Sequence, residues 1–142
     1  MVSEAINDFI KRLELAISQD NIIDVAYQIT EDLQERPDAF LAVSPILKIL
    51  EANPDVDFGT PGPLVHFVEK FYKQGYEELL VDSIKRCPTE LTIWMLNRII
   101  NGSKGEQKAY FLQILKNVTT ISTVNEGIKS LSYQFISIHE GT

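Results

Sequence analysis

Residues that could perform chemistry are few in this sequence. The chain contains two histidines and one cysteine, and neither the His-Glu-x-x-His nor the Cys-x-x-Cys spacing of zinc sites occurs. His66 lies in an apolar segment and is predicted to be a half-buried helix residue with a neighbouring hydrogen-bond partner, whereas His139 lies near the C-terminal end of the sequence. Cys87 precedes Pro88, and a cysteine in such a place is typically a small buried hydrophobic residue, with a reactive thiol as the alternative.

Two further segments carry fragments of ligand-binding motifs. Asp55 and Asp57 stand in a turn-rich loop, but the glycine and the closing glutamate of a calcium-binding loop are missing. The segment Gly102-Ser103-Lys104-Gly105 lacks the first glycine of a phosphate-binding loop and any preceding strand, so it is predicted to be a turn between helices. The sequence therefore predicts no metal site, no cofactor and no enzymatic activity.

Net charge is the most informative bulk property of the chain. Its 142 residues carry a formal net charge of −7. Residues 1–59 hold 12 acidic and 4 basic side chains, and residues 60–142 hold 8 acidic and 9 basic ones, so the negative excess belongs to the N-terminal part. An acidic surface repels nucleic acid and anionic membrane, and it accelerates encounters with basic partners. An ordinary solubilising surface explains the same charge equally well.

The densest group of carboxylates falls on one predicted helix, opposite its apolar positions. Like charges at this density repel one another, and a basic partner would relieve that repulsion. A solvated helix face is the alternative interpretation. The candidate partner-binding carboxylates are Asp24, Glu31, Asp32 and Glu35 on this helix, with Asp38, Glu51, Asp55 and Asp57 nearby if the helical hairpins stack.

A second candidate surface lies in segment 92–101, an unusually apolar stretch interrupted by Asn97 and Arg98. One interpretation is a central helix in which Asn97 is structural and Arg98 bonds to neighbouring carbonyl groups. The other is that Trp94 and Arg98 are partly exposed, because tryptophan and arginine are favoured anchors of protein interfaces. Both interpretations stay open at this point.

Helical periodicity governs almost the whole chain. Apolar residues recur at spacings of three and four, and proline or glycine interrupts the pattern between the predicted helices. Seven or eight helices joined by short turns predict an all-α fold of stacked helical hairpins, similar to an irregular HEAT array. Residues 132–138 include strand-forming types, so a terminal strand is the alternative to a last helix.

Several helix starts are predicted from their capping residues. Ser3 is the cap expected for the first helix. Ser44-Pro45 and Thr60-Pro61 each offer a cap followed by proline at the first helical position. Thr89 is expected to cap the helix that follows the one predicted over residues 76–86.

The cellular setting is predicted from what the chain lacks. No stretch approaches the roughly 18–20 consecutive apolar residues that a membrane span requires. The N-terminal sequence has neither the basic start nor the apolar run of a secretory signal, and a single cysteine is typical of a reducing compartment. We therefore expect one cytoplasmic domain over residues 1–142, with an acidic part at 1–59 and a near-neutral part at 60–142.

Three segments of the sequence resemble a known group of proteins. They are Gly59-Thr60-Pro61-Gly62-Pro63-Leu64-Val65-His66-Phe67-Val68-Glu69, Arg86-Cys87-Pro88-Thr89 and Thr92-Ile93-Trp94-Met95-Leu96-Asn97-Arg98-Ile99-Ile100-Asn101. Over residues 58–116 the chain resembles the small helical immunity proteins of bacterial polymorphic-toxin and contact-dependent growth inhibition systems, the immunity protein 30 group in particular. The resemblance implies a cytosolic protein that binds one cognate toxin domain, frequently a nuclease, and blocks its active site. It implies no catalytic residues.

The expected function is therefore that of an immunity protein whose partner is a basic toxin C-terminal domain, without nucleic-acid or membrane binding. Nucleases are basic where they hold nucleic acid, so an acidic inhibitor could present carboxylates to the same lysines and arginines. The alternative is a HEAT-like scaffold or adaptor that binds a peptide or protein partner in a concave groove. An enzyme would instead require a deep pocket that gathers His66, Cys87 or several carboxylates.

Overall fold

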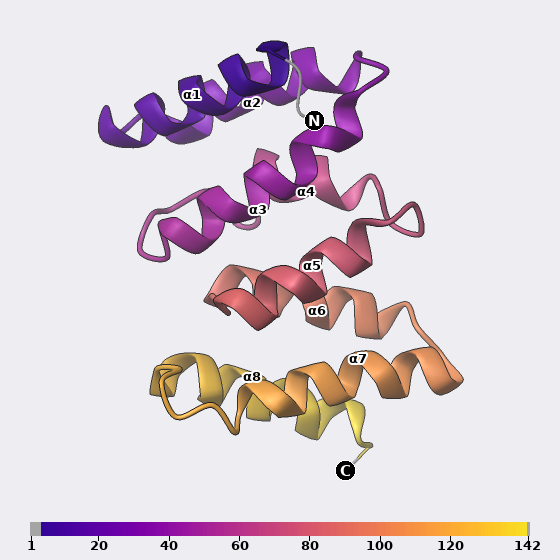
Figure 1. Ribbon diagram of the computed structural model, residues 1–142. Helices are drawn as coiled ribbons and strands as arrows, with labels where there is room; N and C mark the ends of the chain where they lie inside the picture. The colour runs from indigo at the N-terminus through magenta and orange to yellow at the C-terminus, as the bar shows by residue number, and fades with distance from the viewer. Residues whose placement is uncertain (1–3, 142) are drawn as a thin grey trace. The chain divides into compact units, whose positions relative to one another are not determined.

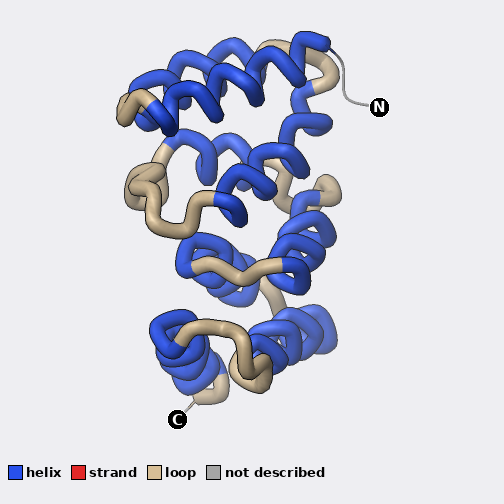
Figure 2. The backbone as a smooth tube through the Cα atoms, turned by 60° about the vertical axis from the view of Figure 1, so that its left-hand side comes forward, coloured by secondary structure: helices blue, strands red, loops and turns tan. Residues whose placement is uncertain are grey.

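The computed structural model describes residues 4–141, and this part of the chain is built from helices (Figure 1, Figure 2). Within residues 4–141 there are eight α-helices, one 3₁₀ helix and no strand, which confirms the predicted all-α class. Residues 132–138 belong to the last helix, so the alternative of a terminal strand is wrong. The elements are α1 (Glu4–Ser18), α2 (Ile22–Gln34), η1 (Ala39–Ala42), α3 (Val43–Ala52), α4 (Pro63–Glu69), α5 (Tyr76–Arg86), α6 (Glu90–Asn101), α7 (Gly105–Val118) and α8 (Glu126–His139).

The helices form two compact units, and the chain passes from one to the other between Leu79 and Leu80. We call them the N-terminal unit and the C-terminal unit. The N-terminal unit contains 15 acidic and 6 basic side chains, a net charge of −9, and the C-terminal unit contains 5 and 7, a net charge of +2. The division between the units therefore separates the charges more sharply than the boundary at residue 59. The single domain expected from the sequence stays a prediction.

The N-terminal unit is a set of helices packed pairwise along their apolar stripes. α1 packs against α2, α2 packs against α4, and α3 packs against η1 and α4. Three residues separate α1 from α2 and four separate α2 from η1, and such short connections favour antiparallel neighbours. The fully buried core side chains of this unit include Ile6, Leu13, Ile29, Leu33, Ile46, Leu47, Leu50 and Leu64.

α2 shows how the core determines which residues face outward. Its buried residues Ile22, Ala26, Ile29 and Leu33 recur at spacings of three and four, so they share one side of the helix. Burial of that stripe against the neighbouring helices fixes the rotation of α2 about its axis. The carboxylates on its other sides are consequently held at the surface.

Two predicted helix starts are wrong, and in neither case does a side chain cap the helix. η1 runs directly into α3, so Ala42 occupies the cap position and Ser44-Pro45 lies inside the first turn, where a missing N–H costs no hydrogen bond. α4 begins at Pro63 with Gly62 as its cap, two residues after the predicted Thr60-Pro61 start. In each case a backbone conformation, rather than a side-chain cap, sets the helix start. Ser3 lies outside the described residues.

The C-terminal unit packs α6, α7 and α8 against one another. α6 begins where it was predicted, because the Thr89 side chain accepts a hydrogen bond from the Thr92 N–H and the Thr92 hydroxyl accepts one from the Thr89 N–H. This reciprocal pair is a capping box, and both threonines are buried. Asn125 caps α8 with a single hydrogen bond, which its side chain accepts from the Ile128 N–H. Side-chain caps thus define the first turns of α6 and α8.

Removing the α6 cap should weaken the C-terminal unit. We expect Thr89→Ala to lower the free energy of unfolding by about 1–2 kcal/mol, because it leaves a buried helix N–H without its acceptor. Thr89→Ser keeps the hydroxyl and should recover most of the loss. Urea denaturation followed by circular dichroism compares the three proteins. Equal destabilisation by serine and alanine would contradict a role for the cap.

Candidate functional site

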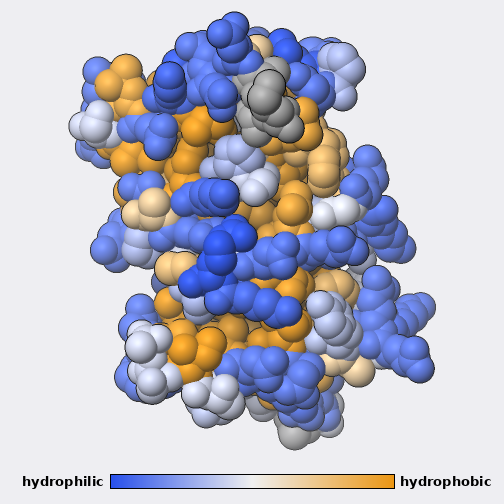
Figure 3. All heavy atoms as spheres, viewed as in Figure 1, coloured by the Kyte–Doolittle hydropathy of each residue, from blue (hydrophilic) through white to orange (hydrophobic). Residues whose placement is uncertain are grey.

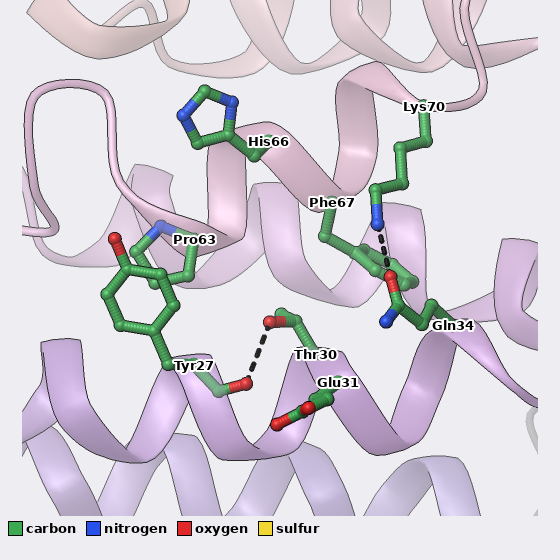
Figure 4. Close-up of a pocket in the computed structure, with 8 residues that line it drawn as sticks. All are labelled: Tyr27, Thr30, Glu31, Gln34, Pro63, His66, Phe67 and Lys70. Atoms are coloured by element: carbon green, nitrogen blue, oxygen red, sulfur yellow. Dashed lines mark hydrogen bonds between the residues drawn. The ribbon is translucent and has the colours of Figure 1, made fainter.

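The N-terminal unit contains an open groove between α2 and α4, with a volume of about 390 Å³ (Figure 4). α2 forms one wall and α4 the other, and Lys70 directly after α4 closes one end. This volume lies at the small end of the roughly 300–1,000 Å³ that is usual for ligand sites. The lining residues are Tyr27, Thr30, Glu31 and Gln34 from α2, and Pro63, His66, Phe67 and Lys70 from the α4 side.

The groove follows from one spacing that occurs twice in the sequence. On α2 the lining residues stand at positions i, i+3, i+4 and i+7 from Tyr27, and those on the α4 side stand at the same spacings from Pro63. Such a set makes one continuous stripe along a helix. Because α2 and α4 pack side by side, the two stripes face each other. Sequence analysis missed the groove, since nothing in either stripe alone indicates that these two helices are neighbours.

Some polar side chains of the groove form hydrogen bonds, and others are exposed. The Thr30 hydroxyl donates a hydrogen bond to the Ala26 carbonyl at 2.8 Å, and Lys70 Nζ donates one to Gln34 Oε1. Phe67 is buried, whereas the Tyr27 side chain is 57% exposed. Glu31 is exposed at the surface. The groove thus has an apolar floor and, at one end, the hydrogen-bonded ammonium group of Lys70. An exposed tyrosine and an exposed carboxylate lie elsewhere on its α2 wall.

His66 and Cys87 differ from their predictions. The His66 side chain at the α4 wall of the groove is exposed and not half-buried, and Figure 4 shows its ring projecting from α4 away from α2. Cys87 is exposed and not a buried hydrophobic residue, because it directly follows the last turn of α5. The two residues also belong to different units.

Neither a candidate metal-ligand cluster nor a candidate membrane-spanning helix is found among the described residues. Among residues 4–141, no group of three or more histidine, cysteine, aspartate or glutamate side chains could hold a metal ion. No helix in that range combines the length and apolar character needed to cross a bilayer. Comparison of the chain with protein-family models, curated proteins and solved structures found no match.

The four candidate carboxylates at α2 are all exposed, but they do not form a single row. Asp24, Glu31 and Glu35 are separated by seven and four residues, which returns them to nearly the same side of the helix. Asp32 follows Glu31 and is rotated from it by about 100°. Within residues 4–141 we find no ion pair that involves any of the four. Their charge is therefore open to a basic partner, and Glu31 also lines the groove.

The other candidate carboxylates are in more varied surroundings. Asp38 pairs with Arg36, with 2.8 Å between the Asp38 Oδ1 and Arg36 Nε atoms, and this pair raises the pKa of Arg36. The Asp57 carboxylate accepts a hydrogen bond from the Gly59 N–H at 2.9 Å and so helps to shape its loop. Glu51 is half-buried and Asp55 is exposed. Asp55 and Asp57 are both exposed, and no hydrogen bond or ion pair within residues 4–141 involves the Asp55 carboxylate.

Segment 92–101 combines the two interpretations that the sequence left open. Asn97 is buried and accepts a hydrogen bond from Nε2 of His139 in α8, so it is structural. Trp94 is 46% exposed and its ring meets that of Phe135 edge-on, with 4.8 Å between their centroids. Arg98 is exposed. Trp94 and Arg98 therefore lie on the surface of the C-terminal unit, where a partner could reach them.

Exposed hydrophobic side chains occur in both units. In the space-filling view, hydrophilic side chains cover much of the face that is drawn, and hydrophobic surface is visible between them (Figure 3). Scattered exposed hydrophobic residues are normal on soluble proteins, so they mark no site by themselves. Among the described residues, the large exposed ones are Leu15, Tyr27, Leu41, Trp94, Tyr110, Ile121, Tyr133 and Ile138.

The surroundings of His139 predict a pH dependence of stability. Desolvation lowers the pKa of His139 below its ordinary value of 6.5, and the nearby positive charge of Lys108 lowers it further. The unfolded chain therefore binds a proton more readily than the folded chain, and stability present above about pH 6.5 is lost as the pH falls towards the folded-state pKa. We expect His139→Gln, whose amide can still donate to Asn97, to unfold with a weaker pH dependence.

Chemical denaturation at about pH 7.5 and about pH 5.5 measures this effect. Lys108→Met offers an independent check, because removal of the positive charge raises the pKa of His139 and should also reduce the loss of stability. A wild-type pH dependence in both variants would contradict the prediction.

Proposed function

We propose that this chain is an immunity protein, which binds the toxin domain of a bacterial polymorphic-toxin system in the cytosol and neutralises it without catalysis. The observation that carries the proposal is the net charge of −9 on the N-terminal unit, together with exposed carboxylates on α2 that have no ion pair among the described residues. Such a surface favours a basic protein as partner and disfavours nucleic acid and anionic membrane.

The physical route to inhibition is competition for basic side chains. A toxin that cleaves nucleic acid must hold phosphates with lysine and arginine. Carboxylates such as Asp24, Glu31 and Glu35 can take the place of those phosphates and cover the substrate-binding surface. The resemblance of residues 58–116 to immunity proteins supports this assignment, and it lies entirely outside the acidic helix α2. A shared scaffold with a separate recognition surface would give this arrangement.

Charge alone would not give tight binding. Long-range attraction mainly raises the rate of association, whereas affinity depends on a few well-packed anchors at the centre of an interface. Tyr27 is a suitable anchor, since it is exposed and lies beside Glu31 on the same groove wall. A stable complex would also have to bury more than about 1,000 Å² in total, which requires contacts well beyond the groove.

Co-expression tests the proposed function directly. The protein encoded immediately upstream of this chain's gene is the first toxin candidate, and its C-terminal domain is expressed from an inducible promoter in bacteria. We expect growth to stop when this domain is induced alone and to continue when the present chain is co-expressed. An acidic helical protein of similar size serves as the control. Growth arrest that the present chain does not relieve would refute the assignment.

A second candidate function is that of an adaptor that binds a peptide or protein in a groove. The observation that favours it is the α2/α4 groove, whose two walls carry matching stripes of side chains. An adaptor of this kind should bind short linear peptides, whereas an immunity protein should need its folded toxin. Binding assays with the intact partner and with its overlapping peptides therefore separate the two functions.

A further inference from the structure

The two ends of the α2/α4 groove differ in their chemistry, although the unit as a whole is acidic. At one end, Lys70 donates its hydrogen bond to Gln34. Further along α2, the Tyr27 ring is exposed, and Glu31 lies one turn away from it at spacing i+4. Figure 4 shows Tyr27 and Pro63 at the opposite end of the groove from Gln34 and Lys70. A ligand with one charged end would therefore have a preferred direction in the groove.

We propose that the Tyr27 end of this groove receives an arginine side chain of the basic protein partner. The inference rests on the proposed function for the existence of such a partner. In the proposed arrangement the guanidinium group stacks on the Tyr27 ring and donates hydrogen bonds to the Glu31 carboxylate. The aliphatic part of the side chain lies along Pro63 and Phe67.

Electrostatics favours a cation at this end. Glu31 is exposed, no ion pair within residues 4–141 involves it, and Asp24 and Glu35 lie on nearly the same side of α2. Aromatic rings add to this attraction, because a cation within about 6 Å of the ring centroid interacts with the negative face of the ring. Lys70 disfavours a second cation at the other end, which places the guanidinium at Tyr27.

Arginine fits this pair of groups better than lysine does. Its guanidinium is planar and weakly hydrated, so it stacks on aromatic rings, and its fork of N–H groups can bind a carboxylate through two hydrogen bonds. The groove volume of about 390 Å³ is also small. It suits one long side chain with some water and is too small for a folded element of the partner.

A blocked Gly-Arg-Gly peptide is the probe, and the same peptide with neutral citrulline in place of arginine is its control. Binding is followed by NMR through the Tyr27 ring signals and the amide signals of Thr30 and Glu31. We expect saturable shifts at millimolar concentrations of the arginine peptide and much weaker binding of the citrulline peptide. Shifts of equal size with both peptides, or no shifts with either, would overturn the proposal.

Variants at Tyr27, Glu31 and Glu35 separate groove binding from general attraction to the acidic unit. Glu31→Gln should weaken binding of the arginine peptide about threefold, and Tyr27→Ala should weaken it by about the same factor. Tyr27→Phe keeps the ring and should retain most of the binding. Glu35→Gln removes the same charge from the same helix outside the groove lining and should have a smaller effect than Glu31→Gln. Equal effects of the two glutamine variants would overturn the proposal.

This assay requires no toxin, so its outcome is distinct from that of the co-expression test. If the chain protects cells but does not bind the arginine peptide, the proposed function is supported and the groove assignment is overturned. A chain that binds the arginine peptide in the groove but protects against no toxin would support the groove and refute the function. The folding of each variant is checked from the dispersion of its NMR spectrum.

Discussion

Replacing Gly62 by alanine is expected to destabilise the N-terminal unit by about 3–5 kcal/mol. Gly62 adopts φ +90° and ψ 175°, a conformation that is essentially restricted to glycine. A Cβ atom at this position would overlap the carbonyl oxygen of Phe58 and lie 2.7 Å from its carbonyl carbon. Phe58 is buried, and Pro63 after the glycine opens α4, so neither side of the contact can move without disturbing the core.

Gly105 provides the matched control for this substitution. It also has a positive φ, +59°, but a Cβ atom there would meet nothing within 4 Å. Gly105→Ala should therefore cost only the roughly 1–2 kcal/mol of the left-handed conformation. Urea denaturation followed by circular dichroism measures both variants, and hydrogen exchange of α4 amides localises the effect of Gly62→Ala. Similar losses in the two variants would contradict the steric explanation.

The largest functional effect is expected from reversing the charge at the end of α2. The triple variant Glu31→Lys, Asp32→Lys and Glu35→Lys changes the net charge of the N-terminal unit from −9 to −3. The proposed function predicts that, at low ionic strength, this variant associates with the toxin domain about 10- to 100-fold more slowly than the wild type, because electrostatic steering is lost. Its association rate should also depend less on salt. Stopped-flow measurements at several salt concentrations test both effects.

The control for this prediction reverses three exposed carboxylates of the C-terminal unit, Asp82, Glu90 and Glu106. Both triple variants change the net charge of the whole chain from −7 to −1. If α2 lies in the contact surface, the control should slow association much less than the α2 variant does. Equal slowing would mean that only the total charge matters and that α2 is not the recognition surface.

Local signals predicted part of the fold well. The helix over residues 76–86 and the Thr89 cap of the next helix are confirmed, because glycine, proline and threonine determine the local backbone there. Ser44-Pro45 and Thr60-Pro61 carry similar signals, but the helix starts predicted from them are wrong. A 3₁₀ turn that continues into α3 overrides the first of them, and the glycine conformation before Pro63 displaces the second.

The groove could not be predicted, because it depends on a contact between helices that are not consecutive. η1, α3 and the loop after it separate α2 from α4 in sequence, and only the fold brings Tyr27 and Glu31 to the same groove as Pro63 and His66. The charge asymmetry was visible from composition alone. Its boundary was not, because the acidic residues between 60 and 79 belong to the N-terminal unit.

Inhibition of the purified toxin domain tests the central claim most directly. The activity of the toxin domain, for a nuclease the cleavage of its nucleic acid, is measured while the present chain is added in increasing amounts. The proposed function predicts that activity falls linearly and is abolished when the two proteins reach a ratio of one to one. Activity that persists in an excess of the chain would contradict the claim that this acidic helical protein neutralises a toxin by binding it.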